Sequence, residues 1–208
     1  KTTLQRTRLD VPRYRWANTL DDALKSGRRI GYPLTAKVVS PAIYRKSDWE
    51  GVETRVIDDE ALRAAFHRFS RLPDFMGILV EERCSEGPSI KVGVTRIDYG
   101  REAVIILESR AMYPRIAKCR GCQLSEKGRC HIRSSLKALG LRCCADRGAR
   151  PPFNELAFEQ MLEKAVRLVV EHKPDMEAVI FDPVRCTPDR CIVLDVRVKL
   201  FPKISINL

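Results

Sequence analysis

The stretch GYPLTAKVVSPAIYRKSDWEGV, residues 31–52, decides how the fold of this 208-residue sequence is predicted. Within it, LTAKVVS (34–40) is an apolar, β-branched run that predicts a strand. The polar residues 41–52 predict a loop after that strand. Lys37 interrupts the apolar run, and a charge in such a place is usually paired or functional. We therefore favour a functional role for Lys37 over the alternative, a surface lysine on an edge strand.

Helix and strand patterns flank this stretch on both sides. Thr19 is an N-cap residue with Asp22 three positions later, which predicts a helix over LDDALKSGRRI (20–30). Apolar residues recur at helical spacing in DDEALRAAFHRFSR (58–71) and again over residues 155–172. The runs that predict further strands are GILVEER (77–83), SIKVGVTR (89–96), EAVIILE (102–108), EAVIF (177–181) and CIVLDVRVKL (191–200). This order of elements predicts a mixed α/β (α+β) fold with a largely antiparallel sheet that carries helices.

The composition is that of an ordinary globular protein, with 44% hydrophobic and 31% charged residues. No apolar run approaches the roughly 20 residues that a transmembrane helix needs, and no signal segment opens the sequence. The sequence therefore predicts no membrane span and no secretion, and we expect a cytoplasmic protein. Reducing compartments keep thiols free, so the cysteines are expected to be ligands rather than disulfides.

Five of the eight cysteines crowd into KCRGCQLSEKGRCHIRSSLKALGLRCC, residues 118–144. The C-x2-C step suits a metal centre, because two thiolates from a tight turn can reach a single ion. Two further thiolates complete the four that both zinc and a [4Fe–4S] cluster accept. The uneven spacing of the later cysteines favours the [4Fe–4S] cluster over zinc, and the sequence does not decide which of the two adjacent cysteines binds. The predicted ligands are Cys119, Cys122, Cys130, Cys143 and Cys144.

The other three cysteines give weaker evidence for a metal site. Cys186 and Cys191 flank the turn TPDR, so they can face each other across a hairpin. We interpret them, like Cys84, as buried thiols that act as small hydrophobic groups. The alternatives at this hairpin are a second metal site and a reversible disulfide.

The positive charge is concentrated in the cysteine-rich segment. The whole chain carries a formal charge of +11, and residues 118–150 hold nine cations and two acids, which gives +7 for that segment. A basic patch fits nucleic-acid binding, but it also compensates the negative charge of a thiolate-ligated metal. The segment has no aromatic residue on which a base could stack. The segment therefore does not favour nucleic acid as a partner.

Residues 31–52 resemble the ATP-grasp subunit of the NDP-forming acyl-CoA synthetases, relatives of the succinyl-CoA synthetase β chain. That family typically reads G-Y-P-V-V-L-K-V-V-S-P-D-I-L-H-K-S-D-x-G-G-V at this place. GILVEER is similar to the family's G-V-L-V-Q-E and KVGVTR to I-V-G-V-T-R, while VIFDPVRC and IVLDVRV resemble L-D-I-N-P and V-A-L-D-A-R. The resemblance implies an ATP-grasp fold, with a small lobe and N-terminal extension over 1–75. Residues 76–208 would form the large lobe, interrupted by the cysteine-rich metal-binding segment 115–150.

The resemblance also implies which residues bind a nucleotide. Lys37 would contact the α and β phosphates, and Lys46 and Ser47, followed by Asp48, would lie on a loop that covers the phosphates. The alternative for this loop is a solvated polar turn. One residue of the pair Glu81 and Glu82 would accept a hydrogen bond from a ribose hydroxyl, and strand alternation places the two on opposite faces.

Asp182 and Asp195 lie where the family places its Mg²⁺ ligands. Two acids that face one pocket favour a bound cation, and the alternative is a salt bridge from one of them to Arg185 or Arg197. Three departures stand against these similarities. They are Arg45 in place of a histidine, Glu50 in place of a glycine, and IILESR (105–110) in place of a glycine-rich phosphate-binding stretch.

Two functions remain open at this point. In the first, the chain binds ATP or ADP with Mg²⁺ and exchanges a phosphoryl group with a phosphohistidine on a partner subunit that also binds CoA. In the second, it is a catalytically inactive ATP-grasp-like subunit that carries an iron–sulfur or zinc centre and serves assembly or electron transfer in a larger complex. The sequence does not decide whether the chain is an active ligase.

Overall fold

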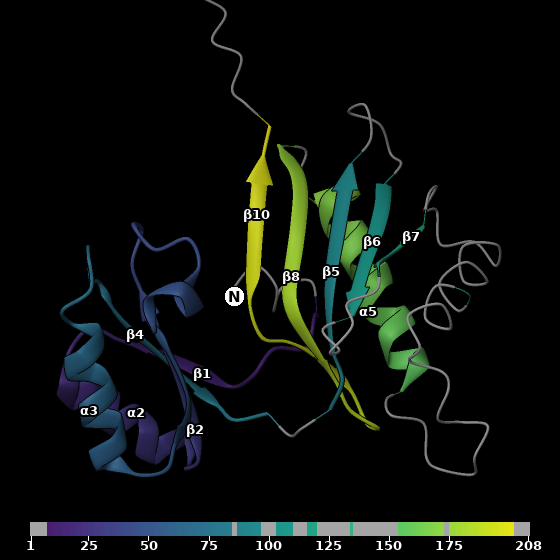
Figure 1. Cartoon of the computed structure of the whole chain (residues 1–208). Helices are drawn as coiled ribbons and strands as arrows, with labels where there is room; N and C mark the ends of the chain where they lie inside the picture. The colour runs from purple at the N-terminus through teal and green to yellow at the C-terminus, as the bar shows by residue number, and fades with distance from the viewer. Residues whose placement is uncertain are drawn as a thin grey trace, which may run out of the picture. The chain divides into compact units, whose positions relative to one another are not determined.

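The chain divides into two compact units (Figure 1). One is Pro12–Cys84, and the other combines Lys1–Val11 with Ser85–Leu208. The division therefore falls nine residues after the boundary expected between residues 75 and 76, because the strand at 77–82 pairs inside the first unit. The computed structural model describes residues 8–84, 87–96, 103–109, 116–119, 134, 154–172 and 175–201.

The unit Pro12–Cys84 is a four-stranded antiparallel sheet with two helices. The strand order is β1-β4-β2-β3. Its elements are β1 (Tyr14–Ala17), α2 (Leu20–Ile30), β2 (Leu34–Val39), η1 (Lys46–Trp49), β3 (Val52–Val56), α3 (Asp59–Phe69) and β4 (Gly77–Glu82). Side chains from both helices pack with alternate strand residues in one apolar core. Both helices therefore cover the same face of this sheet.

Helix α2 begins at the residue that the sequence predicts, and α3 begins at Asp59, one residue after the start of the predicted segment 58–71. The Thr19 side chain accepts a hydrogen bond from the backbone N–H of Asp22, and Asp58 accepts one from the N–H of Ala61. These bonds satisfy amides that have no partner within the helix. Gly31 ends α2 with a φ of 96°, a conformation that L side chains rarely adopt.

A three-residue polar network joins α2 to α3. Arg28 donates two hydrogen bonds to Asp59 Oδ2, at 2.8 Å from Nε and 2.5 Å from Nη2. The Tyr32 hydroxyl donates to Asp59 Oδ1 at 2.6 Å. The hydrogen bond from Arg28, followed by the one from Tyr32, lowers the pKa of the Asp59 carboxyl. The charged form of Asp59 is therefore favoured in the folded state.

This network predicts a pH dependence. Because the folded-state pKa of Asp59 lies below its ordinary value of about 3.9, its contribution is present above that value and lost as the pH falls through the folded pKa. We expect Asp59→Asn to be less stable than the wild type in urea at neutral pH and the difference to shrink at about pH 3. Asp21→Asn, in the first turn of α2, is the control. A difference that stays constant with pH would contradict this role of Asp59.

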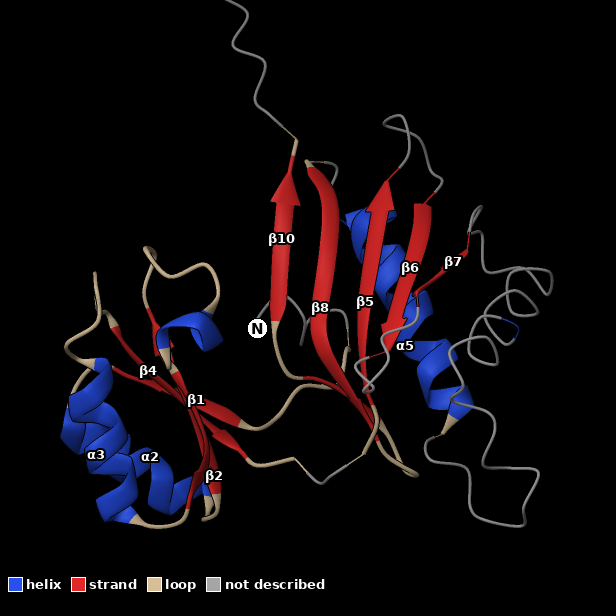
Figure 2. Cartoon of the chain, viewed as in Figure 1, coloured by secondary structure: helices blue, strands red, loops and turns tan. Residues whose placement is uncertain are grey.

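The second unit is built on a six-stranded antiparallel sheet. The strand order is β10-β8-β5-β6-β7, with β9 also paired to β8. The elements are β5 (Ser89–Arg96), β6 (Ala103–Ser109), β7 (Ile116–Cys119), α5 (Glu155–Arg167), η3 (Leu168–His172), β8 (Met176–Cys186), β9 (Cys191–Val193) and β10 (Val196–Leu200). Figure 2 shows that α5 runs along one face of this sheet. Asn154 caps α5 by accepting from the N–H of Ala157.

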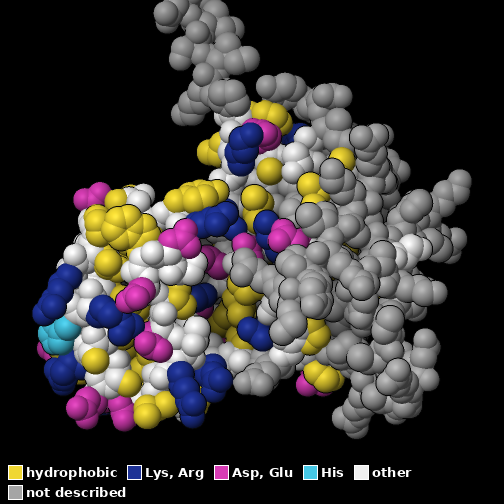
Figure 3. Space-filling view, in the orientation of Figure 1, with side chains coloured by type: hydrophobic (Ala, Val, Ile, Leu, Met, Phe, Trp, Pro, Cys, Tyr) yellow, Lys and Arg dark blue, Asp and Glu magenta, His cyan; other side chains and the backbone are white. Residues whose placement is uncertain are grey.

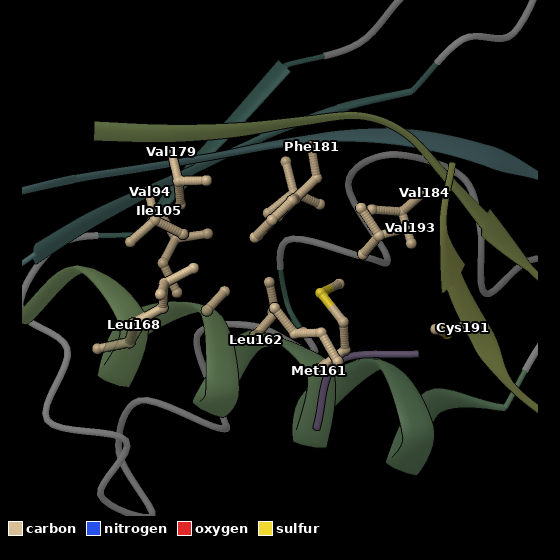
Figure 4. Close-up of a cluster of buried hydrophobic side chains, with 14 of the residues drawn as sticks. Val94, Ile105, Met161, Leu162, Leu168, Val179, Phe181, Val184, Cys191 and Val193 are labelled. Atoms are coloured by element: carbon tan, nitrogen blue, oxygen red, sulfur yellow. The ribbon is translucent and has the colours of Figure 1, made fainter. Parts of the chain in front are cut away.

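The apolar core of this unit lies between α5 and the sheet. Figure 4 shows Met161 and Leu162 of the helix pointing towards Phe181 and Val179 of β8. Phe181, Val179 and Leu162 are fully buried, and Ile105 of β6 belongs to the same cluster. Strand residues that alternate with these buried ones therefore lie on the sheet face away from α5.

The predicted fold class is confirmed, with local differences. The helices and most of the predicted strands form near their expected bounds. The predicted strand 177–181 is longer than expected, since β8 continues to Cys186, and the predicted strand 191–200 is divided into β9 and β10 at Leu194 and Asp195. The sequence reasoning missed β1, β7 and β3, and β3 begins at the last residue of the predicted loop 41–52. Across the described ranges, no helix combines the length and the apolar character that crossing a membrane requires.

Candidate nucleotide and metal site

A buried ion pair links Lys37 and Glu81 in the first unit. Lys37 Nζ lies 2.8 Å from Glu81 Oε2, and the two residues are 8% and 1% exposed. Antiparallel pairing sets Thr35 opposite Glu81 and Lys37 opposite Leu79, so the pair is a diagonal contact between β2 and β4. The alternative of a surface lysine on an edge strand is wrong, because β2 lies inside the sheet.

Glu82 points to the opposite side of β4 from Glu81. Glu82 Oε2 lies 2.5 Å from Nε of Arg13, a residue just before β1. The sequence expectation that the two glutamates occupy opposite faces is thus confirmed. Only Glu81 shares a face with Lys37, so Glu81 holds the lysine ammonium in place.

The residues Lys46, Ser47 and Asp48 form a short 3₁₀ turn, η1, rather than an extended loop. Ser47 and Asp48 are exposed, and Lys46 is half-buried. The turn closes through a hydrogen bond of 2.8 Å from the N–H of Gly51 to the carbonyl of Lys46. This turn places the three residues on the connection between β2 and β3, where the Ser47 hydroxyl donates to Asp48 Oδ1 at 3.3 Å.

The backbone at the end of η1 shows why glycine suits positions 50 and 51. Glu50 has a φ of 51° and a ψ of 25°, in the left-handed region. A Cβ added to Gly51 would lie 2.5 Å from Val38 Cγ1, so this position has no space for a side chain. The glycine that the resemblance expects at position 50 is thus replaced by a residue that adopts the same conformation with strain.

This strain predicts a stabilising substitution. We expect Glu50→Gly to raise the free energy of unfolding by about 0.5–1 kcal/mol, since the relief of left-handed strain exceeds the greater entropy of the unfolded glycine chain. Chemical denaturation of the two proteins measures the change. Glu60→Gly, in the first turn of α3, is the control and should destabilise. An equal loss in both variants would contradict the strain at Glu50.

A β-bulge sets the position of Asp182 in the second unit. Ile90 of β5 pairs with Val184 of β8, and Val92 pairs with Phe181, so Lys91 alone faces the two residues Asp182 and Pro183. A bulge of this kind re-aims a side chain. Proline suits the bulge because it has no N–H to donate to the ladder.

Asp182 and Asp195 are brought together by the main chain. The N–H of Asp182 donates to the carbonyl of Asp195 at 3.0 Å. Asp195 Oδ1 accepts from the N–H of Val196 at 2.9 Å. The two predicted magnesium ligands are therefore neighbours on adjoining segments of one sheet.

Asp182 also makes the salt bridge that the sequence reasoning gave as its alternative role. Arg197 Nη2 lies 2.7 Å from Asp182 Oδ2, and the side chains are 23% and 9% exposed. Arg185 instead donates to the carbonyl of Gly87 at 2.8 Å. A cation that binds Asp182 must therefore share the carboxylate with Arg197 or displace Arg197 from it.

The segment IILESR places an acid in the middle of the second sheet. Glu108 of β6 lies opposite Lys91 of β5, and Lys91 Nζ is 2.8 Å from Glu108 Oε2. The sequence reasoning missed Lys91, although a lysine between the buried residues Ile90 and Val92 repeats the signal that singled out Lys37. It missed the roles of Arg13 and Glu108 because these depend on strand register.

The predicted metal-binding cysteines fall almost entirely outside the described residues. Cys119 ends β7, and Cys122, Cys130, Cys143 and Cys144 lie beyond the described ranges. Within those ranges, no group of three or more His, Cys, Asp or Glu residues could hold a metal ion. The cysteine-ligated centre therefore stays a prediction.

Cys186 and Cys191 face each other across the β8–β9 hairpin, as their spacing predicts. Both are buried thiols outside any disulfide. The hydrogen bond with Cys191, followed by burial, raises the pKa of the Cys186 thiol. Cys186 is therefore held as a thiol, and both cysteines belong to the apolar core.

Comparison with known proteins identifies the family. The ATP-grasp domain family matches residues 1–200. The β subunit of acetate–CoA ligase (ADP-forming) II from Pyrococcus furiosus is 30% identical over 96% of this chain and 89% of its own length. The β subunit of acetate–CoA ligase (ADP-forming) I from the same organism is 26% identical over 92% of this chain and 85% of its own length.

A solved structure shares the fold. The acetyl-coenzyme A synthetase 1 of Ca. Korarchaeum cryptofilum, in complex with coenzyme A and Ca-AMPCP, superposes with a TM-score of 0.80 at 23% identity. The match covers 96% of this chain and 90% of that chain. The fold is thus ATP-grasp, as the resemblance of residues 31–52 implies. The chain belongs to the ATP-grasp domain family and, within it, to the relatives of the β subunits of ADP-forming acyl-CoA synthetases.

Proposed function

We propose that this chain is the nucleotide-binding subunit of an ADP-forming acyl-CoA synthetase. It binds ATP or ADP with Mg²⁺ and exchanges a phosphoryl group with a phosphohistidine on a partner subunit, which carries the CoA site. The observation that carries this proposal is the buried Lys37–Glu81 pair on the interior strands of the first unit. Burying two charges is costly unless they serve each other or a ligand, and a lysine held in one position suits a phosphate contact.

The described side chains suit a magnesium nucleotide. Lys37 supplies a fixed ammonium for the phosphates, while Lys46 and Ser47 supply further donors from η1. Asp182 and Asp195 supply the carboxylate oxygens that Mg²⁺ prefers. Magnesium, when bound, neutralises charge that develops on the transferred phosphoryl group.

The adenosine contact remains part of the proposal. Glu81 and Glu82 end β4, and either carboxylate could accept from a ribose hydroxyl. Because Glu81 is 1% exposed and bound to Lys37, we assign it the role of positioning the lysine. Glu82 is the more accessible of the two and is our choice for a nucleotide contact.

The proposal also includes a partner subunit and a cellular compartment. Two of the similar proteins are named as β subunits of acetate–CoA ligases, which supports a partner subunit and a small carboxylic acid as the acyl substrate. The buried thiols Cys186 and Cys191 suit a reducing compartment, and we place the protein in the cytoplasm.

Nucleotide binding tests this function directly. We expect isothermal titration calorimetry of the full chain to detect Mg-ATP and Mg-ADP, and Asp182→Asn to weaken magnesium-dependent binding by about tenfold or more. Glu177→Gln, at the other end of β8, is the control. If neither ATP nor ADP binds the wild type with or without magnesium, the proposed function is wrong.

We further propose that Cys119, Cys122, Cys130 and one of Cys143 and Cys144 bind a [4Fe–4S] cluster, with zinc as the alternative. Support comes from the C-x2-C step and the excess of cations in the same segment. Anaerobic metal analysis of the purified protein distinguishes the two. Iron with sulfide and a visible absorbance that dithionite bleaches indicates the cluster, and a colourless zinc-loaded protein indicates zinc.

A second candidate function is an inactive ATP-grasp subunit that serves assembly or electron transfer. Glu108 favours it, because an acid in place of a glycine-rich stretch repels phosphate, and side chains there hinder the close approach of phosphate to the backbone amides. Metal content without any nucleotide binding would support this function over the first.

A further inference from the structure

Four charged residues share the face of the second sheet that lies away from α5. In β5 and β6 the buried residues Ile90, Val92 and Leu107 belong to the core under α5. Lys91 and Glu108 alternate with them, so these two side chains project from the other face.

Asp182 and Arg197 project from that same face. Their neighbours Phe181 and Val196 pack in the core under α5, so alternation turns Asp182 and Arg197 away from the helix. The contact between them, at 2.7 Å, spans β8 and β10. The sheet therefore carries two ion pairs on one face.

These residues form a row across four adjacent strands. Arg197 on β10 contacts Asp182 on β8, the bulge at Asp182 faces Lys91 on β5, and Lys91 contacts Glu108 on β6. Figure 3 shows dark blue and magenta side chains next to one another over the middle of this sheet. The charges alternate along the row and sum to zero.

The two ion pairs of the row differ in exposure. The side chains of Lys91 and Glu108 are 35% and 30% exposed, whereas those of Arg197 and Asp182 are 23% and 9% exposed. A partly exposed ion pair is held weakly. Lys91 can therefore exchange its carboxylate partner for another anion that reaches this face.

We propose that Lys91 is a phosphate-binding residue and that Glu108 masks it until the nucleotide binds. This inference rests on the proposed function and adds a regulated contact for the same nucleotide. The phosphate chain of a nucleoside di- or triphosphate replaces Glu108 as the partner of the Lys91 ammonium. Glu108 thereby lowers the affinity for the nucleotide, since its carboxylate competes with the phosphates.

Calorimetry with Mg-ATP, Mg-ADP and AMP tests this exchange on the full chain. We expect Lys91→Gln to weaken Mg-ATP binding by about tenfold or more, because it removes a charged donor and exposes the phosphates to Glu108. We expect Glu108→Gln to strengthen binding of Mg-ATP several-fold, with little effect on AMP. Both changes should diminish as salt is raised.

Matched controls separate this role from a structural one. Arg68→Gln removes an ion pair of similar exposure, Arg68–Glu53 at 3.0 Å, from the other unit and should leave nucleotide affinity unchanged. Thermal unfolding should show that all variants fold. Unchanged affinity in both Lys91→Gln and Glu108→Gln, or weaker binding by Glu108→Gln, would overturn the inference alone. Absence of nucleotide binding by the wild type would overturn the proposed function as well.

Discussion

Replacing Lys37 with alanine is expected to lower the free energy of unfolding by about 3–5 kcal/mol, because it leaves the Glu81 carboxylate buried without its cation. Glu81 is only 1% exposed, so water cannot substitute for the lost ammonium. Urea denaturation measures this loss. Calorimetry should show in addition that any remaining folded protein no longer binds Mg-ATP, since the proposed phosphate contact is gone.

A double substitution separates the structural role of Lys37 from its role in binding. Lys37→Met with Glu81→Leu replaces both charges by apolar groups of similar size, which is often neutral or stabilising. We expect the double variant to regain most of the stability that Lys37→Ala loses but to bind no nucleotide. Wild-type affinity in this stable double variant would show that the pair serves packing alone.

The second large effect is expected at Gly77, the first residue of β4. Its φ is 142°, and an added Cβ would lie 2.4 Å from the carbonyl oxygen of Ala17 on β1. Gly77→Ala therefore combines backbone strain with a clash against main chain that cannot rotate away. We expect a loss of about 2–6 kcal/mol in the free energy of unfolding, from strain and overpacking of about 1–3 kcal/mol each.

Gly31→Ala provides the matched comparison for Gly77. Gly31 has a φ of 96°, but nothing lies within 4 Å of the Cβ that alanine would add. This variant should lose only the strain contribution, about 1–3 kcal/mol. Equal losses for the two variants in denaturant titrations would mean that the contact with Ala17 does not contribute.

The local signals in the sequence predicted the helices well. Thr19 and Asp58 are caps whose hydrogen bonds run to residues three positions later, so a reader of the sequence sees both partners at once. Lys37 was found for a similar reason, because a single charge in an apolar strand stands out without knowledge of its partner. The prediction that Glu81 and Glu82 lie on opposite faces needed only the alternation of side chains along a strand.

Features that depend on pairing between distant segments could not be predicted in the same way. The strand β3, sequence VETRV, has only its two terminal valines as apolar residues, and its place at the sheet edge comes from pairing with β2. The contact of Lys91 with Glu108 joins residues 17 apart in sequence and requires the register of β5 against β6. Likewise, the choice of Arg197 over Arg185 as the partner of Asp182 depends on the pairing of β10 with β8.

The buried contact between β2 and β4 also constrains how this gene can change over evolutionary time. The family pattern that this chain resembles keeps the lysine at position 37 but has glutamine where Glu81 stands, so the acid is the more variable partner. Glutamine keeps a side-chain oxygen that can accept from the ammonium, whereas loss of Lys37 leaves a buried carboxylate without its cation. We therefore expect homologues to tolerate a change at position 81 before one at position 37.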